Sequence, residues 1–167
     1  MKILDCSLIR DKIISTLLAV NTTTASYDLS GGLSKRVVAV SSKDLAIDPL
    51  MITEYPHISV RIVSKEETQE QFGGGKTDNM IKVNAEIFCV YDDGSKTATE
   101  TNLFRMVCNV EANLKNDLTL GGFNTLGSQV MNIIPRFADF NNTLGPASPY
   151  NRSAKIETDF FIQQTES

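Results

Sequence analysis

The sequence is poor in the residue types that most often build metal and disulfide sites. It has no tryptophan, one histidine and three cysteines in 167 residues. Cys6, Cys89 and Cys108 are odd in number and lack C-x-x-C spacing, so we expect reduced, structural thiols. His57 has no second imidazole to join it in binding a metal, and we expect it to be a polar residue at a strand edge. The composition therefore predicts neither a metal site nor a cofactor.

Long apolar runs and a surplus of basic residues are missing as well. No stretch reaches the ~18 apolar residues that a membrane span needs, and charged residues interrupt the apolar segment 3–20, which argues against a signal peptide. The net charge of -4 and the isoelectric point near 5.0 argue against a surface that grips phosphate backbones, because such binding requires clustered Lys and Arg. We expect a cytosolic protein that neither enters a membrane nor reads DNA.

Two segments place apolar residues at helical spacing. Residues 4–18 predict an amphipathic helix, with the charged residues 10–12 on its polar side. Residues 98–116 predict a second helix, and its apolar stripe is the strongest periodic signal in the chain. The stripe consists of Leu103, Met106, Val107, Val110 and Leu114. We expect it to pack on a sheet.

Strands are predicted where apolar and polar residues alternate. These segments are 36–41, 57–62, 80–91, 129–134 and 153–163. Residues 65–79 lack periodicity and predict a long loop, a feature that is usually functional or mobile. Strands joined by hairpins around helices are typical of the α+β class. We therefore expect one α+β domain, 1–167, with a mainly antiparallel sheet of four to five strands and two main helices packed on it.

A glycine-rich run inside the expected loop is compared with phosphate-binding loops. The comparison fails because Glu70 stands where that motif needs glycine, and because strand alternation follows instead of a helix. No serine lies in a G-x-S-x-G elbow. We thus expect no catalytic residues, and a loop tip that contacts a partner through Phe72, Gly73, Gly74, Gly75 and Lys76.

Two groups of residues fall on the polar side of the alternating strands. Phe88 and Phe161 make that side partly apolar, and the sequence leaves open whether the first helix or another subunit covers them. The carboxylates Glu86, Glu157 and Asp159 indicate a solvated face. Only two cations, Lys82 and Lys155, are near them in the pattern. Burying these carboxylates between subunits would then be costly, so we expect them to face water.

From about Pro56 onward the order of elements is a strand with PHISVRIV, a long loop, a long strand, a helix that ends in DLTLGG, and two further strands. This order resembles the tail terminator or tail completion (neck) proteins of tailed bacteriophages. The TLGG stretch at Thr119–Gly122 belongs to this resemblance. The segment 21–55 departs from it, being longer and less regular than the family pattern.

The resemblance implies a structural virion protein that is not an enzyme and that assembles in the host cytoplasm. Members of that family form homo-oligomeric rings, hexamers, that cap the tail tube protein and face the head-side connector protein, with DNA only as passing cargo and no membrane partner. In such a ring we expect Phe88 and Phe161 at subunit contacts and the three carboxylates facing the channel. The alternative is a small-molecule-binding or enzymatic α+β domain with its site under the 65–79 loop.

Overall fold

The computed structural model describes residues 3–45, 50, 52–72, 76–92, 95–125, 127–142 and 151–165. Within these ranges the chain forms two α-helices, a short 3-10 helix and one six-stranded sheet, so the α+β class is confirmed. In chain order the elements are α1 (Cys6–Ala19), β1 (Ala39–Ser41), η1 (Ile52–Glu54), β2 (His57–Phe72), β3 (Lys76–Asp92), α2 (Lys96–Asn116), β4 (Asn124–Thr125), β5 (Ser128–Asn142) and β6 (Asn151–Thr165).

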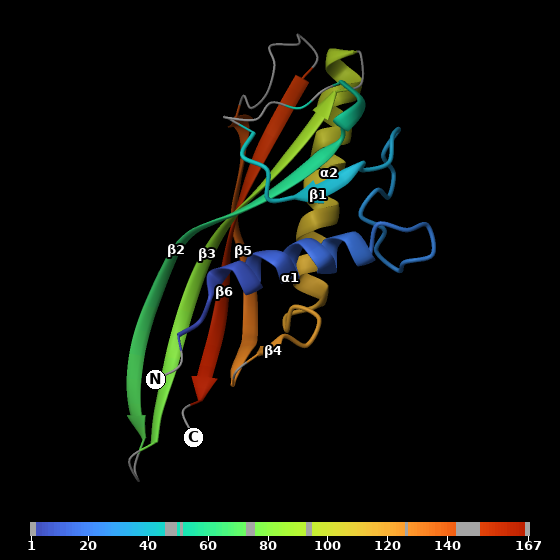
Figure 1. Cartoon of the computed structure of the whole chain (residues 1–167). Helices are drawn as coiled ribbons and strands as arrows, with labels where there is room; N and C mark the ends of the chain where they lie inside the picture. Colours follow the sequence, from blue (N-terminus) through green and yellow to red (C-terminus); the bar gives the residue numbers. More distant parts are fainter. Residues whose placement is uncertain are drawn as a thin grey trace.

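The strands lie in the order β1-β2-β3-β6-β5-β4 in a strongly twisted sheet (Figure 1). β1 runs parallel to β2, and the other neighbouring pairs are antiparallel. The sheet is therefore mixed and six-stranded, which corrects the predicted four to five antiparallel strands. Parallel neighbours need a crossover connection between them, and such a connection gives no hairpin signal. β4 is too short to show any periodicity.

The predicted long loop at 65–79 is wrong, because most of it is strand. β2 continues to Phe72, and β3 begins at Lys76. Lys65 is paired with Val83 and Glu67 with Ile81, so the ladder continues far beyond the apolar part of β2. Side chains from Ser64 to Thr68 are exposed. A strand that is polar on both faces lacks the alternation from which strands are predicted.

Both helices contribute to one core against one face of the sheet. In Figure 1, α1 lies across the strands and α2 runs roughly along them. The predicted stripe of α2 is fully buried, as are Ile9, Ile13 and Leu17 of α1. The Asp5 carboxylate accepts the Ser7 amide at 2.9 Å and so caps α1, which starts the helix. None of the described helices has the length and the apolar character for crossing a membrane.

Polar side chains of α2 hold the connection between α1 and β1. The Asn109 amide donates to the carbonyl oxygens of Leu29 and Gly31 at 3.0 and 2.9 Å. The Ser34 amide donates to Asn102 at 3.0 Å. These bonds satisfy backbone groups that no strand pairs. They fix the path that leads into β1 at the edge of the sheet.

The TLGG stretch forms the turn after α2. Leu120, Gly121 and Gly122 all have left-handed backbone angles, with φ of 52°, 65° and 71°. The Asp117 carboxylate accepts the amides of Thr119 and Gly121 at 3.2 and 2.6 Å. Leu120 is buried, although a left-handed conformation is unusual for a residue with a branched side chain. The turn after α2 therefore explains the two glycines of TLGG without any partner protein.

Candidate functional site

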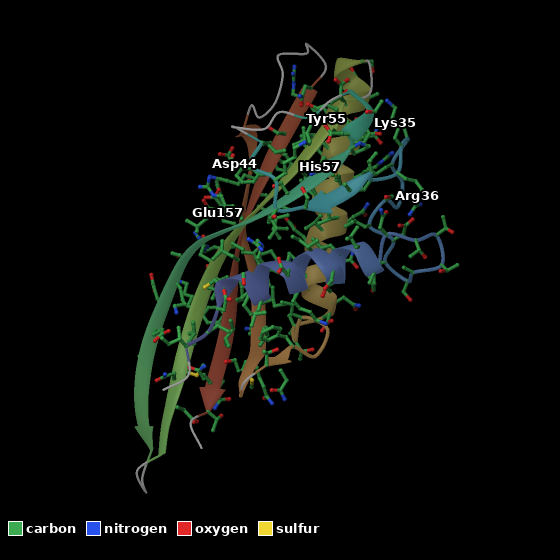
Figure 2. All side chains as sticks on the ribbon, in the orientation of Figure 1. Lys35, Arg36, Asp44, Tyr55, His57 and Glu157 are labelled. Carbon is green, nitrogen blue, oxygen red and sulfur yellow. The ribbon has the colours of Figure 1, made fainter. Side chains whose placement is uncertain are left out.

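We call the sheet face turned away from the helices the open face. Alternate residues of the four long strands form it, because successive side chains of a strand point to opposite faces. Its central residues are Arg61 on β2; Lys82, Asn84, Glu86 and Phe88 on β3; Lys155, Glu157, Asp159 and Phe161 on β6; and Ile134 and Phe137 on β5. Glu157, labelled in Figure 2, lies midway along the sheet.

The structure places the three predicted carboxylates, Glu86, Glu157 and Asp159, next to one another on this face, and we call them the open-face carboxylates. Glu86 is the direct cross-strand partner of Glu157, and Asp159 is the partner of Asn84. Two carboxylates directly opposite destabilise a sheet unless cations lie between them. The surroundings of these residues therefore decide what the open face can do.

Arginine side chains from both outer long strands neutralise the open-face carboxylates. Arg136 of β5 lies 3.2 Å from Glu157 and 3.2 Å from Asp159, and Arg61 of β2 lies 3.8 Å from Glu86. Lys155 lies 3.5 Å from Glu157. The Asn84 amide donates to Asp159 at 2.8 Å. The open face thus carries a paired network rather than a field of negative charge.

The alternation in the sequence indicates only lysines as nearby cations and gives no sign of Arg136. β5 has an irregular register between Pro135 and Phe137, and Arg136 is the extra residue there. A bulge shifts the alternation of a strand, so counting along the sequence gives no face for such a residue. The premise that the carboxylates lack paired cations is corrected. Their position in a channel stays a prediction.

The two phenylalanines predicted at subunit contacts lie on the open face on either side of the carboxylates. Phe88 is opposite Lys155, and Phe161 is opposite Lys82. The sequence left open whether the first helix or another subunit covers Phe88, and part of its cover comes from neither. It comes from the connection after β1, where Leu45, Leu50 and Tyr55 form a second apolar cluster with Val90. Helix α1 belongs to the core of the other face.

The predicted partner-contact residues fall at the tip of the β2–β3 hairpin. Phe72 is the last residue of β2, and Lys76 is the first residue of β3. Gly73, Gly74 and Gly75 lie outside the described residues. A role of this tip in binding a partner stays a prediction.

An apolar surface on β5 was not predicted. Met131, Ile134, Phe137 and Phe140 are 50%, 43%, 55% and 39% exposed, and we call this set the apolar edge. Phe140 makes an edge-to-face contact with Phe104 of α2, with ring centroids 5.0 Å apart. Phe104 is itself 44% exposed. The predicted strand ends at residue 134, because the apolar residues of β5 occupy both faces and its bulges break the alternation.

His57 forms a contact between strands. Its Nε2 atom lies 2.7 Å from the Ser41 hydroxyl, which joins β1 to β2. The residue is 3% exposed, so the predicted position at an open strand edge is wrong: β1 covers it. In Figure 2 it lies beside Tyr55 at the start of β2. Burial lowers the pKa of His57, which keeps the imidazole neutral.

A partly enclosed hollow among the described residues lies between α1 and α2. Its volume is about 150 Å³, and it is lined by apolar residues of both helices and by polar residues at the end of α2, such as Ile13, Leu17, Asn113, Leu114 and Asp117. No convergent set of titratable groups points to a reaction there. Among the described residues, no group of three His, Cys, Asp or Glu side chains is arranged to hold a metal ion.

Comparison with known proteins gives no family for this chain. No protein-family model matches it, and no curated protein matches it significantly. The function is therefore argued from the surfaces described above.

Proposed function

We propose that this protein is a structural virion assembly protein that forms a ring of identical subunits, caps the tube of a phage tail and joins it to the head-side connector. The observation that carries this proposal is the apolar edge on β5. Long, exposed apolar edge strands are rare in proteins that work as monomers, because they pair with other chains.

The exposed fractions of the apolar side chains on β5 indicate how much free energy their burial in a contact would contribute. Fully burying a large apolar side chain contributes about 1.5–3 kcal/mol. Met131, Ile134 and Phe137 are each about half exposed, so each leaves roughly 1 kcal/mol to be gained in a contact. Arg136 and Phe140 lie on the same strand, and arginine and phenylalanine are among the residue types enriched in protein interfaces. The surface therefore supports assembly with other chains.

The paired network on the open face is compatible with a position in the channel of a ring and with a position at a subunit contact. Charges that already have partners in their own subunit lose less on burial than isolated ones. Their near neutrality also avoids a surface that would hold DNA by releasing counterions. A channel lining and a subunit contact both remain consistent with these contacts, and the charge-reversal experiment in the Discussion separates them.

The alternative, a small-molecule-binding or enzymatic domain with its site under residues 65–79, stays a prediction, and the described residues of that segment are paired strands. The assembly proposal is tested by adding the purified protein to growing tail tubes. We expect ring-shaped particles at one tube end in electron micrographs, and tubes that stop growing. Tubes that keep growing, with no particle at their ends, would contradict the proposal.

A further inference from the structure

Both outer long strands have stretches without a neighbour in the described part of the chain. β1 pairs with β2 only at residues 57–59, and β4 pairs with β5 only at residues 124–125 with 128–129. Among the described residues, the outer edge of β2 has no neighbouring strand over residues 60–67, and the outer edge of β5 has none over residues 130–138. β1 covers only the start of β2 at one edge of the sheet, and β4 covers only the start of β5 at the other edge.

The two unpaired stretches lie at the same levels of the sheet. The register can be followed from β2 across β3 and β6 to β5. At one level the partners are Val60, Ile87, Ile156 and Ala138, and at another they are Glu67, Ile81, Ile162 and Val130. Residues 60–67 on one edge and 130–138 on the other are thus matched in height and nearly in length.

The directions of the two strands are also complementary. β2 is antiparallel to β3, β3 to β6, and β6 to β5, so β2 and β5 run in opposite directions. A second copy placed beside the first in the same orientation would lay its β2 antiparallel to β5. The geometry points to this contact: β5 of one subunit pairs with β2 of the next, so that the sheets of neighbouring subunits join. The inference rests on the proposed ring and names its subunit interface.

Side chains on the two stretches support the same pairing. The apolar edge lies on β5, and Val63 of β2 is 46% exposed at the facing edge. Phe137 is at the level of Arg61 and lies on the same open face, so the joined sheet brings this exposed ring beside Arg61 of the next subunit.

Backbone irregularities make the contact selective. Pro135 has no amide hydrogen to donate to a ladder, and both stretches contain bulges, at Val63 on β2 and at Met131 and Arg136 on β5. Such features suppress pairing with arbitrary strands. Arg61 and Arg136 approach each other in the joined sheet, and each keeps a carboxylate of its own subunit as partner. A contact between two different patches closes into a ring when the rotation per subunit allows it.

Cysteine cross-linking tests the pairing directly. Ile134 is level with Ser64, next to Val63, so Val63→Cys and Ile134→Cys face each other in the joined sheet. Both are placed in a background with Cys6→Ser and Cys108→Ser and oxidised with diamide. We expect covalent oligomers longer than a dimer from the doubly substituted protein. Each single variant alone should stay uncross-linked, and a mixture of the two should give dimers.

A second variant measures the contribution of the aromatic anchor. Phe137→Asp should weaken self-association at least about tenfold, as removal of a central interface residue does. Tyr27→Asp is the matched control, because Tyr27 is 51% exposed but lies in the connection between α1 and β1. The control should associate like the parent. Circular dichroism and thermal unfolding check that both variants fold.

The outcomes separate this contact from the ring proposal. An oligomer that gives no cross-link and tolerates Phe137→Asp would overturn the edge pairing while leaving a ring through another surface. Dimers from Ile134→Cys alone would show pairing of β5 with β5 and overturn the head-to-tail arrangement. A parent protein that is monomeric at every accessible concentration would overturn both the contact and the ring.

Discussion

Replacing Arg136 with alanine tests whether the open-face network is held together as the geometry indicates. Arg136 lies 3.2 Å from both Glu157 and Asp159, and its side chain is 50% exposed while that of Asp159 is only 7% exposed. Removing one partner of a buried pair costs about 3–5 kcal/mol, whereas exposed pairs contribute about 0–1 kcal/mol. Because only one partner is buried, we expect Arg136→Ala to lower the free energy of unfolding by roughly 1–3 kcal/mol.

Arg61→Ala is the matched control on the opposite long strand. Arg61 lies 3.8 Å from Glu86, and its side chain is 57% exposed. We expect a loss below about 1 kcal/mol from this longer, more exposed pair. Urea unfolding followed by circular dichroism, at one fixed protein concentration, measures both variants. Equal losses, or a larger loss for Arg61→Ala, would refute the assignment of Asp159 as the buried centre of the network.

Three further outcomes follow from buried and charged groups. Leu114→Ala should cost roughly 2–5 kcal/mol, whereas Leu118→Ala, at an exposed site beyond the end of α2, should cost little; similar urea midpoints would contradict the core assignment. Because burial lowers the pKa of His57 below its usual 6.5, the unfolded chain takes up the proton first as pH falls. Stability should therefore be full above pH 6.5 and decline as the pH falls below 6.5, and His57→Gln should remove this decline in thermal unfolding. Reversing the open-face carboxylates to lysine should leave rings intact but slow DNA passage in a salt-dependent way if they line a channel; loss of the ring from a variant that circular dichroism shows to be folded would place them at a subunit contact.

The parts of the fold that could be predicted are those where one apolar face alternates regularly. The stripe from Leu103 to Leu114 is continuous, so the sequence places α2 and its buried side without ambiguity. The apolar half of β3 shows the same regularity at period two. In both elements the local pattern and the burial have the same cause, because one face packs on the core.

The parts that could not be predicted depend on pairing between distant segments. β2 beyond Ser64 is polar on both faces, and only its ladder with β3 makes it a strand. The parallel position of β1 beside β2 depends on pairing between separate segments, and the sequence between them has no periodicity. Arg136 and the apolar edge were missed because bulges on β5 break the alternation. The site therefore lies mainly where local signals fail.

The most direct test of assembly is the mass of the purified protein in solution, measured by size-exclusion chromatography with light scattering over a range of concentrations. One chain has a mass of 18.4 kDa. We predict a species whose mass is a fixed multiple of this value, well above a dimer, and which Phe137→Asp converts toward the single chain. A mass of one chain for the parent protein at every concentration would contradict the account.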